Sequence, residues 1–256
     1  MLIIMTDSIL SLTLVAFVFI LAGLVKGVIG MGLPTIAIGL LGLIVAPVEA
    51  AAMLVLPSLV TNIWQLISGP SFVALLKRFK TLLIGICFGT PLGVSFIVSG
   101  QMAIVTAGLG FVLMAYGLYG LSGLRIPVAP RAESWLSPLM GFFTGIVSGA
   151  TGIAALPIAP YFTALELKRD DLIQALGLSF TVASIALAIG LLITGEFELD
   201  IATTSLLALA PAFVGMFFGQ FLRKKIPQEK FRRYFFFSLV ILGAATSFRA
   251  ISLIPG

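Results

Sequence analysis

The chain has 256 residues, of which 60% are hydrophobic and only 10% are charged. A soluble domain carries about 25% charged residues, and one transmembrane helix needs about 20 apolar residues, so this composition excludes a soluble protein and predicts an integral membrane protein. The formal net charge of +5 comes from basic residues between apolar segments, which favours cytoplasmic loops over a nucleic-acid-binding surface.

Taken in order, the apolar segments form two similar series on either side of a polar linker. Each series opens with a segment interrupted by glycine and proline, and three segments long enough to cross a bilayer follow. The predicted fold class is an all-α polytopic membrane protein built from two repeats. We expect the first repeat at residues 1–124, with a hairpin at 8–46 and helices at 50–68, 81–99 and 102–123. A cytoplasmic linker follows at 125–135. We expect the second repeat at residues 136–256, with a hairpin at 136–164 and helices at 172–194, 201–222 and 234–253.

Each hairpin contains one copy of a glycine-rich motif. The first copy reads GLVKGVIGMGLP (23–34) and the second reads GFFTGIVSGATGIAALP (141–157). Glycine frees the backbone dihedrals, and proline can begin a helix but cannot continue one. Each copy therefore predicts a helix, a break within the membrane and a second, short helix, which we expect at 33–46 in the first hairpin and at 153–164 in the second. Paired broken helices in matching halves indicate the binding site of a transporter.

The charges of the loops predict the topology. The loop at 77–80, the linker and the loop at 223–233 are basic and are expected in the cytoplasm, whereas the acidic turn at 196–200 is expected outside. Counting the crossings then places both ends of the first hairpin outside and both ends of the second inside. The sequence therefore predicts an inverted-topology repeat, with both termini on the outer side.

The breaks also predict the chemistry of the site. At each break the second arm presents the N-terminus of a helix, whose unpaired N–H groups and positive dipole end favour an anion. We therefore expect a small anionic substrate to bind to backbone around Gly30, Gly32 and Pro34 in the first copy and around Gly149 and Gly152 in the second. The alternative is that these glycines only allow close helix packing.

Polar side chains near the breaks are the next candidates for binding the substrate. Ser148 and Thr151 lie in the second break. Four further polar residues share one face of the helix at 50–68, namely Ser58, Thr61, Asn62 and Gln65. Their alternative role is hydrogen bonding between or within helices. Lys26 is a basic residue within an apolar segment, so it either attracts the anion or extends to the cytoplasmic interface.

The sequence carries no sign of catalysis. It has one cysteine and no histidine, and it contains no nucleophile–base pair, nucleotide-binding motif or zinc-ligand spacing. We therefore expect no enzyme activity, no cofactor and no metal site. Glu49 and Glu166 each follow the second arm of a hairpin, where they either carry a coupling proton or are solvated charges at helix ends.

The duplicated glycine motif, the row of small residues Gly85, Gly89 and Gly93, and the layout of apolar segments resemble the TauE/SafE sulfite exporter family over essentially the whole chain. The resemblance implies a permease of the bacterial inner membrane that exports small sulfur-containing anions, such as sulfite or organosulfonates. The function expected is therefore secondary transport by alternating access, with the substrate at the two hairpin tips. The alternatives are a passive anion channel and a membrane scaffold without flux. A homodimer is one possible assembly.

Overall fold

The computed structural model of the chain describes residues 9–99, 101–124, 127–129, 131–223, 225 and 227–253. Over these residues the chain forms eleven helices and no strand, which confirms the predicted all-α fold class. The predicted outer position of both termini concerns residues outside the described ranges. In chain order the helices are α1 (Ile9–Ile29), α2 (Leu33–Leu41), α3 (Pro47–Ile67), α4 (Phe72–Ile97), α5 (Met102–Ser122), α6 (Glu133–Thr151), α7 (Ile158–Ala164), α8 (Arg169–Ile193), α9 (Leu199–Leu207), α10 (Leu209–Leu222) and α11 (Gln228–Ser252).

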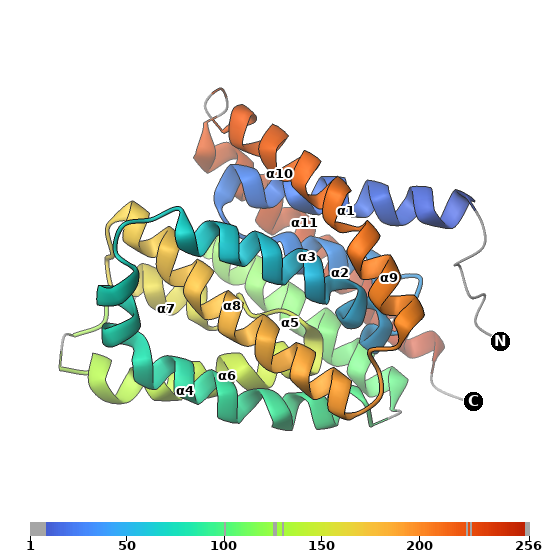
Figure 1. The fold of residues 1–256 in the computed structure, drawn as a ribbon, viewed down its shortest axis with the longest axis horizontal. Helices are drawn as coiled ribbons and strands as arrows, with labels where there is room; N and C mark the ends of the chain where they lie inside the picture. The colour runs from blue at the N-terminus through green and yellow to red at the C-terminus, as the bar shows by residue number, and fades with distance from the viewer. Residues whose placement is uncertain are drawn as a thin grey trace.

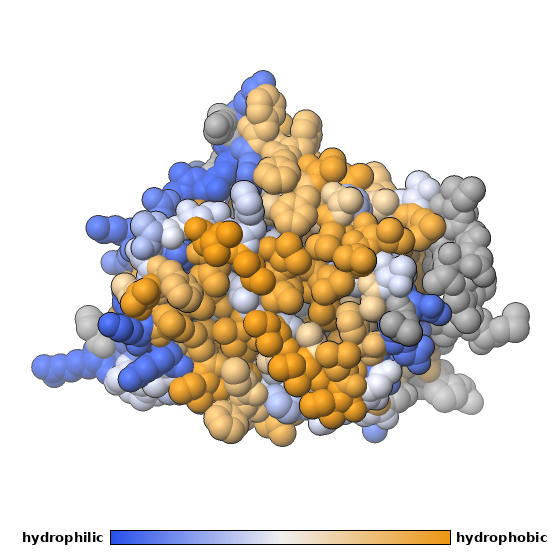
Figure 2. Space-filling model, in the orientation of Figure 1, coloured by the Kyte–Doolittle hydropathy of each residue, from blue (hydrophilic) through white to orange (hydrophobic). Residues whose placement is uncertain are grey.

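The molecule is a multi-pass membrane protein. Within the described residues, seven helical stretches are long and apolar enough to cross a bilayer. Large apolar side chains on these stretches point outward, as with Phe88, Phe111 and Phe248, which are 71%, 67% and 76% exposed. Figure 2 shows the resulting broad hydrophobic surface, with hydrophilic side chains gathered at its left-hand end. The seven stretches are Leu12–Ile29, Pro47–Ile67, Phe72–Ile97, Met102–Ser122, Arg169–Ile193, Asp200–Leu222 and Glu229–Ser252.

The helices pack in pairs that join the two halves of the chain. α1 packs along α10 and α6 packs along α4, so the first helix of each hairpin lies against a helix of the other half. α3 packs on α8, and α5 packs on α11. In Figure 1, α1 and α10 lie at the top, α3 and α8 cross the middle, and α4 and α6 lie at the bottom. Such reciprocal packing, in which the first helix of each half contacts a helix of the other half, is expected for two halves related by a two-fold axis in the membrane plane. The inverted topology and the division into repeats stay predictions.

The glycines that open each motif lie at these helix contacts. A Cβ atom at Gly23 would overlap the carbonyl oxygen of Ala212 in α10, and one at Gly141 would overlap that of Leu82 in α4. Small residues that let backbones approach this closely are typical of interfaces between membrane helices. Gly27, Gly145 and Gly149 lie at the same helix contacts, whereas Gly30, Gly32 and Gly152 have the left-handed backbone of the breaks.

Several helix boundaries differ from the predicted ones. α4 begins at Phe72, so the basic stretch at 77–80, which was expected to be a loop, is helical. α11 begins at Gln228 and not at 234. Both helices continue past their apolar segments because long basic side chains on the added turns can reach water. The predicted helix at 201–222 is divided at Ala208 into α9 and α10.

Candidate functional site

The first break lies between α1 and α2. Gly30 and Gly32 have φ angles of +81° and +102°, a left-handed conformation that side chains disfavour, so glycine is required at both positions. Gly32 is the N-cap of α2 and provides no side-chain cap, while Pro34 occupies the first turn. The first N–H groups of a helix have no partner within it. The start of α2 therefore presents unpaired donors beside the break.

The second break is longer than the sequence predicts. α6 ends at Thr151, Gly152 has a φ of +72°, and residues 153–157 are not helical before α7 begins. The Thr151 hydroxyl donates to the carbonyl oxygen of Val147 over 2.6 Å and accepts the N–H of Ile153 over 3.2 Å. The expected arm at 153–164 is therefore a short helix, α7, preceded by an irregular segment.

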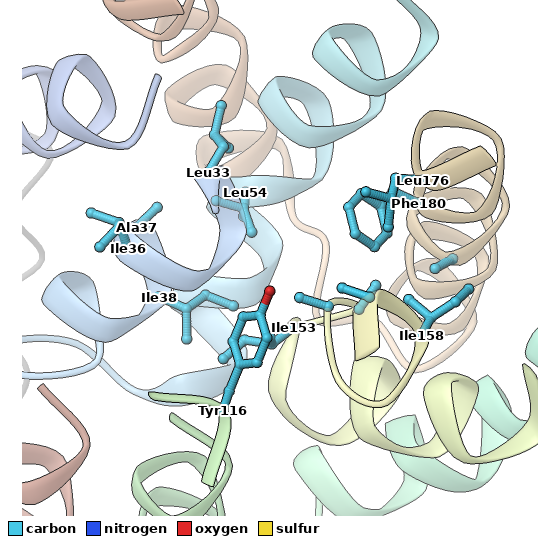
Figure 3. Close-up of a cluster of buried hydrophobic side chains, with 14 of the residues drawn as sticks. Leu33, Ile36, Ala37, Ile38, Leu54, Tyr116, Ile153, Ile158, Leu176 and Phe180 are labelled. Atoms are coloured by element: carbon cyan, nitrogen blue, oxygen red, sulfur yellow. The ribbon is translucent and has the colours of Figure 1, made fainter. Parts of the chain in front are cut away.

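The two breaks are held against each other by apolar side chains. A Cβ atom at Gly152 would overlap the side chain of Ile38 in α2, so only glycine allows this approach. Figure 3 shows Tyr116 between Ile38 and Ile153, with its hydroxyl directed into the cluster. All three residues are buried. This packing fixes the position of the first break relative to the second.

A small cavity lies where the breaks meet. Its volume is about 20 Å³, which is room for a single water molecule. Residues of both breaks line it, together with one face of α3 and one face of α8, so the two breaks meet at this cavity. The lining residues are Gly32, Pro34, Thr35, Ala51, Leu54, Val55, Ser58, Asn62, Ser148, Gly152, Ala154, Ala155, Phe180, Ser184 and Leu187.

Five buried hydroxyls lack a hydrogen-bond partner within the described residues, and two of them lie in the cavity wall; the five belong to Thr35, Ser58, Thr106, Thr144 and Ser179. Thr35 and Ser58 are 1% and 3% exposed, and neither hydroxyl forms a hydrogen bond within the described part of the chain. A buried polar group without a partner is rare in native proteins and calls for a water, an ion or a ligand. Since both residues line the cavity, their hydroxyls are available to a molecule bound there.

Lys26 is the one charged side chain that is buried within the described residues, with an exposure of 3%. Its ammonium group donates to the hydroxyl of Thr61 over 3.0 Å and to the side-chain oxygen of Asn62. The Asn62 amide nitrogen donates in turn to the Ser184 hydroxyl over 3.3 Å. Lys26 therefore does not extend to the membrane surface, and Asn62 connects it to the cavity.

A second, much larger cavity of about 1230 Å³ lies on the other side of the first break. Ile29 and Met31 line it, whereas Gly32 lines the small cavity, so the break forms the wall between the two. The Tyr116 hydroxyl donates to the sulfur of Met31 over 3.0 Å and holds this wall in place. We call the larger cavity the vestibule.

The vestibule is rich in positive charge. The charged side chains that line it include four arginines and two glutamates. Partial burial lowers the pKa of the Arg223 guanidinium, and the nearby Arg169 lowers it further, whereas Asp170 opposes the effect. Basic residues concentrated in a concave surface raise the local concentration of anions. The charged lining residues are Glu166, Arg169, Arg223, Glu229, Arg232 and Arg233.

The family model described as "Sulfite exporter TauE/SafE" matches residues 15–246. The chain belongs to the TauE/SafE sulfite exporter family. No curated protein and no solved structure shows a significant match to it. Proteins of the TauE/SafE family are transporters and not enzymes.

Within this TauE/SafE chain, the predicted site residues fall into three groups. Gly32, Pro34, Asn62, Ser148 and Gly152 line the small cavity. Lys26 lies behind this lining and is bonded to it through Asn62. The remaining four lie outside the lining: Gly30 faces Ile173, Gln65 donates to the carbonyl oxygen of Ile173 over 2.8 Å, Gly149 packs against Thr90 and Val94 of α4, and Thr151 bonds to its own helix.

Sequence reasoning missed three residues of this site and its surroundings. Thr35 directly follows Pro34, so its position in the first turn of the second arm could have predicted it as a site residue. Tyr116 lies in a continuous apolar segment and carries no such signal. Arg249 interrupts the apolar run of α11, and its guanidinium donates to the carbonyl oxygens of Gly42 and Val45, just after α2. It therefore anchors the far end of the short arm.

Proposed function

We propose that this protein is a secondary transporter that exports a small sulfur-containing anion, such as sulfite or an organosulfonate, from the bacterial cytoplasm. The proposal rests on the family, which suggests sulfite export, and on the chemistry of the small cavity. The observation that carries the site is the pair of buried, unpartnered hydroxyls of Thr35 and Ser58 at the meeting point of the two breaks.

The groups around this cavity favour an anion over a cation. The hydroxyls of Thr35 and Ser58 and the first N–H groups of α2 can all donate to an oxyanion. The Lys26 ammonium adds positive charge from behind Asn62. No acidic side chain is among the described residues that line the cavity. A cation would therefore find neutral oxygen ligands but no countercharge here.

The size of the cavity supports alternating access over an open channel. Sulfite has four heavy atoms and cannot fit into about 20 Å³, so the cavity must widen to admit it. The vestibule ends at the first break, where Met31 and Tyr116 are in contact. We infer that the transporter opens by displacement of this wall. A passive channel would require a continuous path.

The expected orientation follows from the charges. We place the arginine-rich vestibule at the cytoplasmic side of the inner membrane, in agreement with the positive-inside rule. An anion would then enter the vestibule, pass the first break and reach the cavity. The two hairpins would move relative to each other as halves of an inverted repeat, with both termini outside.

Uptake of radiolabelled sulfite into proteoliposomes tests the proposal, with methanesulfonate, sulfate and chloride as competitors. We expect saturable uptake that methanesulfonate or sulfate reduces and chloride does not, and we expect Asn62→Leu to abolish it. Thr144→Val is the matched control, since Thr144 is buried in α6 but does not line the cavity. Uptake that does not saturate would indicate a channel, and no uptake by folded protein would favour a scaffold.

A further inference from the structure

The surroundings of Lys26 are unusual for a buried charge. Its two hydrogen-bond acceptors, the Thr61 hydroxyl and the Asn62 side-chain oxygen, are both neutral. The Thr61 hydroxyl donates its own proton to the carbonyl oxygen of Pro57 over 2.6 Å. The Asn62 amide nitrogen donates to Ser184. Lys26 is therefore hydrogen-bonded, but nothing bonded to it compensates a full positive charge.

Other charged and titratable groups lie at the ends of the elements around Lys26. Over their described residues, α2 and α10 carry no titratable side chain, and Lys26 is the only one on α1. Arg223, just past α10, is a further cation. Glu49 of α3 and Asp171 of α8 lie about 20 Å along their helices from Asn62 and Ser184. The other groups are Asp170 and Arg169 at the start of α8, Tyr116 and Tyr119 on α5, Glu229, Lys230, Arg232, Arg233 and Tyr234 at one end of α11, and Arg249 at the other.

A buried ammonium group without a countercharge is costly, because the apolar surroundings cannot replace its hydration. Asn62 both lines the small cavity and accepts a hydrogen bond from Lys26, so an anion held in the cavity would supply the missing charge. The same ammonium would stabilise the anion. By linkage, anion binding and protonation of Lys26 then strengthen each other by the same factor.

We propose that Lys26 carries the proton that is transported with each anion. This inference rests on the proposed function, because it needs an anion at the cavity. When an anion binds, a proton from water joins the Lys26 amine, and when the anion leaves, the proton leaves with it. A monovalent anion then crosses the membrane together with one positive charge. Its transport is electroneutral and follows the combined gradients of the anion and the proton, so export proceeds while the outward gradient of the anion exceeds the inward gradient of the proton.

Proton uptake during anion binding tests this step directly, with detergent-purified protein in weakly buffered solution. The probe is methanesulfonate, which stays ionised at every pH of the experiment, with sulfite measured in parallel against a protein-free blank. We expect up to one proton to be taken up per anion bound at alkaline pH. We also expect affinity to fall about tenfold per pH unit once Lys26 loses its proton in the empty protein.

Three variants separate this role from a structural one. Lys26→Arg keeps a permanent charge, so it should bind the anion without proton uptake and without pH dependence. Lys26→Met should bind weakly and take up no proton. Lys80→Met, which removes an exposed lysine from α4, should behave like the unaltered protein.

The outcomes distinguish this inference from the proposed function. Two outcomes would overturn the role of Lys26 and leave anion transport standing. One is anion binding without proton uptake in the unaltered protein, and the other is proton uptake that persists in Lys26→Arg. Binding of neither methanesulfonate nor sulfite at any pH by folded protein would overturn both. Proton uptake that disappears in Lys26→Arg while binding remains would establish the coupling.

Discussion

Thr35→Val is the most informative single substitution at the cavity. Valine has nearly the shape of threonine and removes only the hydroxyl. Because the Thr35 hydroxyl is buried without a partner, its burial costs about 1–3 kcal/mol in the empty protein. We therefore expect Thr35→Val to stabilise the substrate-free protein by about this amount. A substitution in a protein interior that raises stability is unusual, so the direction of the effect is itself diagnostic.

The same substitution should weaken anion binding. A hydrogen bond to a charged group contributes about 1.5–3 kcal/mol, which corresponds to a loss of about 10-fold to 150-fold in affinity. Ser58→Ala should act in the same two directions, with a smaller gain in stability because a small void remains. Thermal unfolding without ligand measures the first effect, and isothermal titration with sulfite measures the second.

Thr144→Val is the matched control for this pair of measurements. The Thr144 hydroxyl is also buried without a partner within the described residues, but it does not line the cavity. We expect this variant to be stabilised like Thr35→Val and to keep its affinity for sulfite. If Thr35→Val and Thr144→Val change affinity equally, or if Thr35→Val destabilises the empty protein, the assignment of the Thr35 hydroxyl to a ligand is wrong.

Three further substitutions test the packing, the wall of the vestibule and the anchor of the short arm. Gly89→Ala should destabilise the protein by about 1–3 kcal/mol, since the added Cβ would overlap the carbonyl oxygen of Phe142. Its control is Gly108→Ala, whose added Cβ meets open space and should stabilise the helix by about 1 kcal/mol. Equal melting temperatures of the two variants would contradict this. Tyr116→Phe removes the hydrogen bond to Met31 and should speed the labelling of Thr35→Cys, in the small cavity behind this wall, by a thiol reagent added from the vestibule side of protein in which the exposed Cys87 is replaced by serine. Unchanged labelling would count against this wall. Arg249→Met should lower the melting temperature because it leaves two backbone carbonyl oxygens without their donor, and an unaltered melting temperature would argue against the anchor.

The repeated glycine motif predicts the position of the breaks because glycine and proline restrict the backbone locally. In the first copy the predicted second arm at 33–46 begins where α2 begins, at Leu33. In the second copy the predicted arm begins at 153, but α7 begins at Ile158. Residues 153–157 are apolar, and an apolar run without periodicity does not distinguish helix from extended chain.

The burial of Lys26 depends on packing that no local pattern reveals. A lysine near the end of a transmembrane segment can reach the interface or turn inward, and the choice depends on the helices beside it. Here Lys26 finds Thr61 and Asn62, which are 35 and 36 residues away along the chain. The Tyr116 contact with Met31 spans 85 residues and the Arg249 contact with Gly42 spans 207, so both follow only from the tertiary fold.

Loop charges predict the topology well enough to propose an orientation, but they place helix ends poorly. The basic residues at 77–80 were expected in a loop because they interrupt the apolar pattern, and they lie in the first turns of α4. Helical hydrogen bonding continues past the membrane surface wherever side chains can be solvated. Charge therefore indicates the side of the membrane, and not the residue at which a helix begins.

The location of the bound anion tests the central claim most directly. Selenite has the shape and charge of sulfite and scatters strongly, so crystals of the protein soaked in selenite would locate the anion by anomalous diffraction. We predict one site between the two breaks, within hydrogen-bonding distance of the Thr35 and Ser58 hydroxyls, in a cavity wider than about 20 Å³. Selenite found only among the arginines of the vestibule, in protein that transports sulfite, would contradict this account.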